Sequence, residues 1–409
     1  MQTQLADFIR DTPEGREAEA ILRKCVHCGF CTATCPTYQV LGDDLDSPRG
    51  RIYLMKRALE GAPVTAKTRL HLDRCLTCRA CETTCPSGVR YGRLVDIGRA
   101  LVEARTTRGP MNRFLRAALG FVLRRRRLFG FLVAVGRLAR PLLPGALKAK
   151  LPSAVAPPGA WPAPRHARKM LVLAGCVQPS LAPSINAAAA RVLDRFGVSL
   201  IEAPGAGCCG ALRFHLDFQE QGRDDMRALI DAWWPLVERG EVEAIVMTAS
   251  GCGVTIKDYG HLLGEDRHYR QKAARISALA RDLAEVIPIE AIPEGSAAGR
   301  VAFHSPCTLQ HGQQIRGTVE ARLARAGFEV TAVRDAHLCC GSAGTYSLLH
   351  PEIAGELRSR KLLTLNEGGP DEIATANIGC LSHLQGAAQV PVRHWIEILD
   401  DALRRKMPA

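Results

Sequence analysis

Eight of the sixteen cysteines in this 409-residue chain stand in two runs with the same spacing. In each run three cysteines are separated by two residues, and a fourth follows four positions later, directly before a proline. The runs are Cys25, Cys28, Cys31, Cys35-Pro36 and Cys75, Cys78, Cys81, Cys85-Pro86. Three thiolates at this spacing can bind three corners of a four-iron cube, but the fourth corner lies beyond their reach.

The same spacing is found in two-cluster bacterial ferredoxins, where the distant fourth cysteine ligates the other cluster. We therefore predict two [4Fe–4S] clusters. The predicted ligands are Cys25, Cys28, Cys31 and Cys85 for one cluster, and Cys75, Cys78, Cys81 and Cys35 for the other. His27 and His71 stand near these cysteines but occupy no ligand position of the motif, so they are left out of the site.

Two other uses of these cysteines, zinc sites and disulfides, are disfavoured. Paired Cys-x-x-Cys units also form four-cysteine zinc sites, but the third cysteine and the Cys-Pro ending favour iron–sulfur clusters. A disulfide network is disfavoured because the N-terminus is polar and has no apolar stretch of a secretory signal. We expect a cytoplasmic chain with reduced thiols. Peripheral contact with the cytoplasmic face of the inner membrane is compatible with this location.

The other eight cysteines form an internal repeat. The first copy has Cys176, Cys208-Cys209-Gly210 and Cys252, and the second has Cys307, Cys339-Cys340-Gly341 and Cys380. The interval between copies is 131 residues at the first three cysteines and 128 at the last, which indicates duplication of one unit. The glycine after each pair permits a turn that lets adjacent sulfurs converge. Each copy is a candidate four-cysteine metal site, the alternative being reduced buried cysteines.

Short apolar runs in the second half are bounded by Gly, Ser or Pro and are typical of buried strands. They cover residues 170–174, 245–247, 301–303 and 373–376. Helical stretches intervene at 185–196, 219–238 and 351–365. Strands that alternate with helices predict parallel α/β layers, with the cysteines at the carboxyl edge of each sheet.

The first hundred residues are expected to be rich in helix. Residues 1–24 are predicted to form a helix that leads into the first cluster, and Thr12-Pro13-Glu14 has the features of a helix start. Another helix is predicted after Ser47-Pro48-Arg49-Gly50-Arg51. Arg49 and Arg51 could face a partner or a cluster. A solvated helix start explains them equally well.

Charge is concentrated in one segment. Residues 104–169 hold fifteen Lys and Arg and no acid, whereas the rest of the chain has 39 basic and 41 acidic residues. The longest uncharged run at the centre of this segment has nine residues, too few for a membrane span. Apolar stretches with interleaved arginines fit a helix on an anionic membrane surface, a helix that docks on an acidic partner, or a solvated linker helix. Residues 141–164 are rich in Pro, Ala and Gly and predict a linker.

Several function classes are disfavoured. The sequence has no P-loop, no Gly-x-Ser-x-Gly and no Gly-x-Gly-x-x-Gly after a predicted strand, so no substrate site is evident. Aromatic residues make up only 5%, without the basic–aromatic interleaving of a nucleic-acid platform. We expect no nucleic-acid partner and no catalytic residue.

The motifs together resemble a known family. A helix-rich two-cluster ferredoxin domain followed by two duplicated α/β CCG domains is similar to the iron–sulfur subunit of glycolate oxidase. The stretches from Asp46 to Leu54 and from Cys339 to Tyr346 resemble that family in particular. The corresponding domains are expected at 1–103 (ferredoxin-type), 104–168 (basic segment and linker), 169–290 and 298–409 (CCG).

The resemblance implies an electron-transfer subunit. It would pass electrons from a flavin subunit that oxidises glycolate to glyoxylate towards quinone or another membrane acceptor, with possible membrane contact through 104–150. Related iron–sulfur subunits of lactate or glycerol-3-phosphate dehydrogenases are an alternative. So is a heterodisulfide-reductase-like catalytic subunit, but that enzyme's CCG domains end in Cys-x-x-Cys, whereas Thr255 and His383 stand at those positions here. One or two further clusters in the CCG domains stay open.

Overall fold

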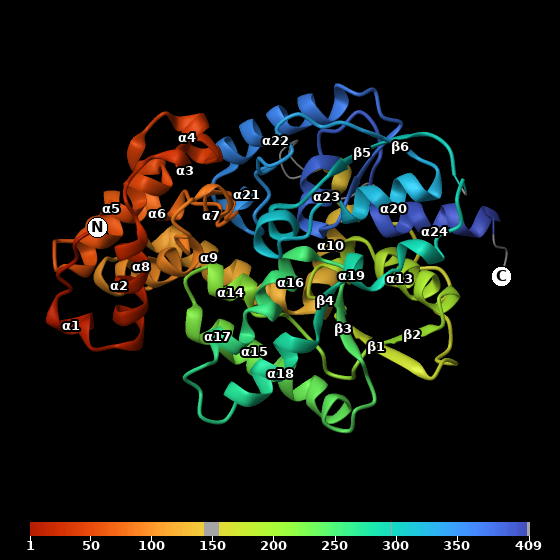
Figure 1. The fold of residues 1–409 in the computed structure, drawn as a ribbon, viewed down its shortest axis with the longest axis horizontal. Helices are drawn as coiled ribbons and strands as arrows, with labels where there is room; N and C mark the ends of the chain where they lie inside the picture. The colour runs from red at the N-terminus through yellow and green to blue at the C-terminus, as the bar shows by residue number, and fades with distance from the viewer. Residues whose placement is uncertain (143–154, 296, 407–409) are drawn as a thin grey trace. The chain divides into compact units, whose positions relative to one another are not determined.

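The computed structural model describes residues 1–142, 155–295 and 297–406 (Figure 1). The chain divides into two compact units: Met1–Ala117 with His337–Lys361, and Ala118–Ala336 with Leu362–Ala409. Of the predicted linker, residues 143–154 lie outside the described part of the chain. The four domain boundaries expected from the sequence follow the motifs rather than these contacts, and they stay a prediction.

The N-terminal part of the first unit is helical, as predicted. Its helices are α1 (Asp7–Arg10), α2 (Pro13–Lys24), α3 (Phe30–Ala33), α4 (Pro36–Leu41), α5 (Pro48–Leu59), α6 (Ala66–Asp73), α7 (Ala80–Thr84) and α8 (Tyr91–Arg105), with the 3₁₀ turn η1 (Asp44–Asp46). Leu22, Met55, Leu59, Leu72 and Leu94 form the centre of its core.

The predicted single helix over residues 1–24 is wrong, because the structure has two helices there. Thr12 is extended, with φ −84° and ψ 157°, since a residue before proline avoids the helical region. Its hydroxyl accepts a hydrogen bond from the N–H of Gly15, so the predicted start of a helix at this point is confirmed.

The second unit contains two four-stranded sheets in which all pairs are parallel. The first sheet has the order β2-β1-β3-β4 and the second has the same order, β6-β5-β7-β8. Their bounds are β1 Arg168–Val172, β2 Val198–Ile201, β3 Ala244–Met247, β4 Ala280–Asp282, β5 Arg300–His304, β6 Glu329–Thr331, β7 Glu372–Thr375 and β8 Val392–His394. The predicted parallel α/β duplication is confirmed (Figure 1).

Helices cover both sheets. In the second unit they are α12 (Gln178–Leu181), α13 (Ser184–Arg195), α14 (Ala211–His215), α15 (Gln219–Glu238), α16 (Ser250–Lys257), α17 (Tyr259–Leu262), α18 (Arg270–Leu279), α19 (Leu283–Val286), α20 (Thr318–Ala326), α23 (Ile378–Gln385) and α24 (Trp395–Lys406), with the π-turn η4 (Thr308–Gly312). The first unit also contains α21 (Tyr346–Leu349) and most of α22 (Pro351–Asn366). One continuous core includes Leu193 of α13 and Leu399 of α24, so the two sheets share buried apolar side chains.

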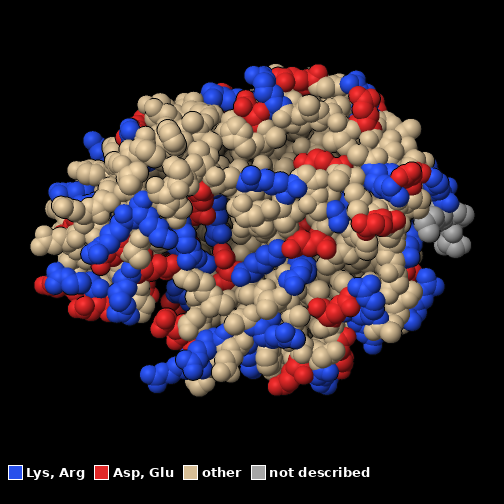
Figure 2. All heavy atoms as spheres, in the orientation of Figure 1, with Lys and Arg blue, Asp and Glu red and all other residues tan. Residues whose placement is uncertain are grey.

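The basic segment is folded as two helices, α9 (Pro110–Arg124) and α10 (Arg126–Leu138). Several of its arginines form ion pairs: Arg108 and Arg116 bind Asp73 in the first unit, and Arg124 binds Asp225 in the second. None of the helices in the described ranges is long and apolar enough to cross a membrane. On the face drawn in Figure 2, basic and acidic side chains alternate instead of forming a patch of one sign.

Candidate metal centres

The two N-terminal cysteine runs have the same backbone geometry. His27 and Thr77 both adopt positive φ, at 59° and 51°, and so do Gly29 and Arg79. These paired positions lie fifty residues apart, as do all four cysteines of the two runs. Left-handed residues curl each loop so that backbone N–H groups point towards sulfur, as the N–H of Thr77 does at 3.4 Å from the Sγ of Cys75.

Each loop borders a cavity. The first cavity has an empty volume of about 450 Å³, and its cysteines are Cys25, Cys28, Cys31, Cys81 and Cys85. The second has about 310 Å³, and its cysteines are Cys35, Cys75, Cys78 and Cys81. Cys85 therefore lies with the first triplet and Cys35 with the second, while Cys81 reaches both cavities.

Four of the thiols around these cavities resist ionisation because they are buried. Burial raises the pKa of Cys31 to about 11, and it also raises the pKa of Cys25, Cys35 and Cys81. Thiolates are the form that ligates iron, so a bound cation must supply the charge that stabilises them. Four sulfurs around one cavity fit a four-iron cluster.

Arg49 and Arg51, whose roles the sequence left open, differ in burial and in the groups that they contact. Arg49 is partly exposed and pairs with Asp44 at 2.9 Å. Arg51 is only 1% exposed, and its Nη1 lies 3.9 Å from the Sγ of Cys35. For Arg51, the interpretation as a solvated helix start is wrong, because the first turn of α5 directs this side chain into the cluster-binding unit.

The first CCG set is brought together inside the second unit. The thiols of Cys176 and Cys209 both hydrogen-bond to Cys208, and Cys209 also contacts Cys252. The hydrogen bonds from Cys176 and Cys209 hold the pKa of Cys208 well below its usual range. Cys176 follows β1 and Cys252 follows β3, so the set lies where the strand order reverses, a place at which open α/β sheets bind ligands.

The glycine after each Cys-Cys pair has the predicted conformation. Gly210 and Gly341 adopt φ of 83° and 87°. A Cβ on Gly210 would lie 2.5 Å from the carbonyl oxygen of Gly222, and one on Gly341 would lie 2.7 Å from that of Ala354. Glycine is therefore required both for the left-handed turn and for the close approach of a neighbouring helix.

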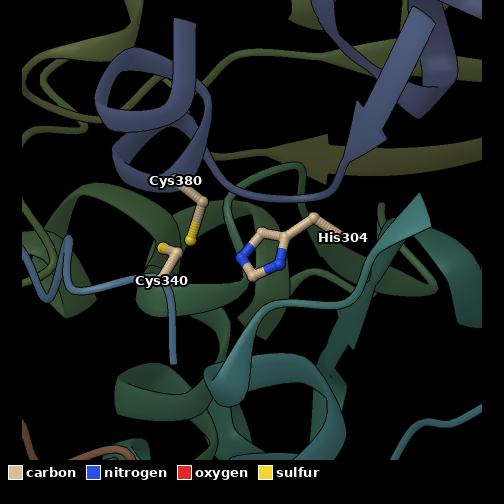
Figure 3. A group of neighbouring side chains, drawn as sticks. All are labelled: His304, Cys340 and Cys380. Atoms are coloured by element: carbon tan, nitrogen blue, oxygen red, sulfur yellow. The ribbon is translucent and has the colours of Figure 1, made fainter. Parts of the chain in front are cut away.

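The second CCG set differs from the first in its surroundings. Cys307, Cys339, Cys340 and Cys380 are all buried, and none of the four is in a disulfide. The ligand atoms of Cys340, Cys380 and His304 lie within 4.8 Å of one another (Figure 3). His304 was not among the residues predicted from the sequence. A comparison of the two repeats could have singled it out, because the equivalent position 131 residues earlier is Leu173, which cannot bind a metal.

A hydrogen-bonded bridge within the second unit joins the neighbourhoods of the two sets. Asn377 donates from Nδ2 to the Sγ of Cys380 at 3.5 Å, and its Oδ1 accepts from the N–H of Gly251 at 3.4 Å. Gly251 directly precedes Cys252. Ser250 and Thr308 add a hydroxyl pair at 2.7 Å beside Cys307. Cys252 and Cys380, one from each set, thus stand beside the same hydrogen-bonded network.

Comparison with protein families gives matches over most of the chain. The family described as "4Fe-4S dicluster domain" matches residues 21–89. The "Cysteine-rich domain" family, CCG, matches residues 170–257 and 301–385. These matches coincide with the helical unit's cysteine loops and with the two parallel sheets. Fold and sites together define an iron–sulfur protein with a dicluster domain and two CCG domains.

Individual relatives identify the kind of iron–sulfur protein more narrowly than the family models do. The chain is 54% identical over 408 residues to the "Glycolate oxidase iron-sulfur subunit" of Escherichia coli K12, covering 99% of this chain and 100% of that protein. It is 27% identical to the "Probable glycolate oxidase iron-sulfur subunit" of Bacillus subtilis, over 90% of each. "Lactate utilization protein A" of Geobacillus kaustophilus is 23% identical over 57% of this chain.

A solved structure shares the fold. "Crystal structure of a hypothetical protein from Helicobacter pylori" superposes with a TM-score of 0.50 at 11% identity, covering 96% of this chain and 72% of that one. At that identity only the fold is comparable. The full-length match to the Escherichia coli protein decides the family: the chain belongs to the glycolate oxidase iron–sulfur subunits.

Proposed function

We propose that this chain is the electron-transfer subunit of a glycolate-oxidising complex and takes electrons from a flavin subunit towards a quinone or another membrane acceptor. The observation that carries the proposal is the pair of cysteine-lined cavities in one unit. The full-length similarity to a glycolate oxidase subunit supplies the substrate of the complex. A lactate-linked complex is the second candidate, supported by the weaker, partial match to a lactate utilization protein. A glycerol-3-phosphate-linked complex rests on the resemblance of the motifs alone.

The proposed ligands follow from the spacing and from the cavities that the cysteines line. One cluster is assigned to Cys25, Cys28, Cys31 and Cys85, and the other to Cys75, Cys78, Cys81 and Cys35. When bound, such clusters accept and release one electron at a time. The chain's own part is to hold the thiolates in place, exclude water from the inner cavity and supply hydrogen bonds to sulfur.

The CCG cysteines are proposed as further cluster sites. The first comprises Cys176, Cys208, Cys209 and Cys252, and its support is the unbroken series of thiol–thiol contacts. The second comprises Cys307, Cys339, Cys340 and Cys380, and its support is the repeat. Four thiolates suffice for an ordinary [4Fe–4S] centre, so the absent fifth cysteines do not prevent binding.

The membrane contact proposed for residues 104–150 is best supported at α10. Phe131, Val135 and Leu138 are spaced along one side of this helix and are 64%, 45% and 85% exposed. Arg126, Arg127 and Arg137 are exposed beside them. An apolar stripe flanked by arginines suits the boundary of an anionic bilayer.

Metal analysis of the anaerobically purified chain tests the proposal first. We expect at least about eight iron atoms per chain, the content of two four-iron clusters. With the flavin-containing partner subunits added, glycolate should bleach the visible absorption of the clusters, whereas the chain alone should not oxidise glycolate. Zinc without iron, or glycolate turnover by the isolated chain, would contradict the proposal.

A further inference from the structure

The cavity lined by Cys35 and Cys75 has a buried arginine at its wall. Arg51 is 1% exposed, and its guanidinium makes four directed contacts. Nε donates to the carbonyl of His71 at 2.7 Å, Nη2 lies 3.3 Å from Oδ1 of Asp46, and Nη1 reaches Thr37 Oγ1 at 3.1 Å and Cys35 Sγ at 3.9 Å. Thr37 Oγ1 is itself 3.3 Å from the same sulfur. The arginine is thus held in place by neutral and anionic partners and faces a predicted ligand.

A buried ion-pair cluster holds Arg51 in place. Asp46 is fully buried and binds Arg51 and Arg74, the latter at 2.8 Å. The Nδ1 of His71 lies 3.1 Å from the same carboxylate, and the exposed Asp43 has a carboxylate oxygen within 4.8 Å of both groups. The two guanidiniums stay protonated in proteins, so the positive charge of Arg51 persists beside Cys35.

A second donor reaches the same cavity from another helix. Tyr91 begins α8, is 3% exposed, and its hydroxyl lies 3.6 Å from the Sγ of Cys75. The backbone N–H of Thr77 points at that sulfur as well. Arg51 and Tyr91 lie forty residues apart in sequence and approach two different ligands of one predicted cluster.

The first cavity has a different environment. Cys28 is exposed, and Val26 and Phe30 on either side of it are 68% and 61% exposed. Arg49, which lines this cavity, is neutralised by the exposed Asp44. The first set of ligands is therefore the more exposed one, whereas Cys35, Cys75 and Cys81 of the second set are buried, and Cys35 and Cys75 receive hydrogen bonds from protein donors.

Reduction makes a four-thiolate cluster more negative by one charge. A buried site opposes that change, because a low-dielectric interior penalises added charge. Hydrogen bonds to sulfur and a nearby cation favour the reduced form. On the proposed function, we infer that Arg51 and Tyr91 are tuning residues that raise the reduction potential of the cluster held by Cys35, Cys75, Cys78 and Cys81, so that the buried cluster can still accept an electron.

Redox titration followed by EPR on the anaerobically purified chain tests the inference. The signal of the buried cluster is identified as the one altered by Cys78→Ser. Arg51→Gln should lower its midpoint potential by at least about 59 mV, a tenfold change in a one-electron equilibrium. Tyr91→Phe should lower it by less, and Arg51→Lys, which keeps the charge, should lie between the parent and Arg51→Gln. The other cluster should keep its potential in all three variants.

Arg49→Gln is the matched control, because it removes an arginine from the same helix turn on the exposed side and should leave the buried cluster's potential unchanged. Iron content and circular dichroism must equal those of the parent. Arg51→Gln could bind less iron than the parent because Asp46 loses a partner. In that case the midpoint potential of Tyr91→Phe is the test, since this substitution removes one oxygen atom and keeps the ring. An unchanged potential in Tyr91→Phe, or equal shifts of both clusters, would overturn the inference. Failure of the proposed function would show differently, as absent iron or as clusters that glycolate and the partner subunits do not reduce.

Discussion

The hydroxyl of Tyr346 donates a hydrogen bond to the backbone carbonyl of Arg74, 3.1 Å away, although 272 positions separate the two residues. Arg74 directly precedes Cys75, a predicted ligand of the buried cluster. Tyr346 ends the Cys339-Cys340-Gly341 stretch that marks the second CCG domain. This bond therefore ties a CCG turn to a ferredoxin-type loop within one compact unit. It holds the segment that follows Cys339 and Cys340 against the residue that precedes Cys75.

Tyr346→Phe should weaken this unit without unfolding it. The carbonyl of Arg74 would lose its donor, and a typical net cost is about 1 kcal/mol of unfolding free energy. Urea unfolding of the parent and the variant measures the change. Tyr53→Phe is the control, since Tyr53 is 49% exposed. Equal destabilisation by both substitutions would mean that the Tyr346 bond contributes nothing specific.

The crossed ligand assignment is tested by pairing serine variants. Cys85→Ser should alter the same EPR component as Cys28→Ser, and Cys35→Ser the same one as Cys78→Ser, because the fourth cysteine of each run lies at the other run's cavity. An uncrossed pattern, with Cys35→Ser grouping with Cys28→Ser, would contradict the assignment. Each variant is expected to keep the signal of its intact cluster.

Removal of a CCG cysteine should release iron. Cys209→Ser is expected to lower the iron content by about four atoms per chain, the content of one cluster, since Cys209 contacts both Cys208 and Cys252. Thr255→Val is the matched control at the position where a fifth cysteine is absent, and it should retain all iron. If Cys209→Ser binds as much iron as the parent, the first CCG set is structural.

Acid should destabilise the second unit through His394. This residue is fully buried, and burial lowers its pKa to about 4, although its hydrogen bond to the carbonyl of Thr248 opposes the shift. Its other ring nitrogen accepts from the N–H of Ile396 at 3.3 Å, which requires the neutral ring. A lowered folded-state pKa gives stability that is present above the unfolded value near 6.5 and is lost as the pH falls towards 4.

Between neutrality and pH 5.5 the expected loss is about 1.4 kcal/mol of unfolding free energy. Urea unfolding at the two pH values measures it. His394→Gln should be less stable at neutral pH but should lose less on acidification than the parent does. A variant with the parent's full pH dependence would show that other groups are responsible.

Membrane binding should depend on the apolar stripe of α10. Phe131→Glu combined with Val135→Glu should reduce flotation of the chain with vesicles that contain phosphatidylglycerol, since two exposed anchors are replaced by acids. Leu363→Glu is the control, because Leu363 is 70% exposed on a different helix. Binding should also weaken at high salt. If neither the parent nor the variant floats, a protein partner becomes the better explanation of the stripe.

Much of the fold followed from local pattern. The strands at 168–172, 244–247, 300–304 and 372–375 lie within two residues of the predicted apolar runs, because buried parallel strands need continuous apolar sequence. The constant interval between cysteines exposed the duplication, and both sheets have one strand order. The helix start at Thr12 was predicted from its capping hydroxyl and the following proline, but the separate short helix α1 before it was not.

The sequence by itself determined which cysteines are the candidate metal ligands, since the spacing of cysteines, the prolines after Cys35 and Cys85, and the glycines after each Cys-Cys pair act over a few residues of backbone. Only the tertiary structure decided what surrounds those ligands. Arg49 and Arg51 stand in one helix turn with similar neighbours, yet one is paired at the surface and the other is buried against Cys35. The difference comes from Asp46, His71 and Arg74, which packing brings to one side of α5. Burial and electrostatic environment depend on contacts between distant segments, and such contacts leave no local pattern in the chain.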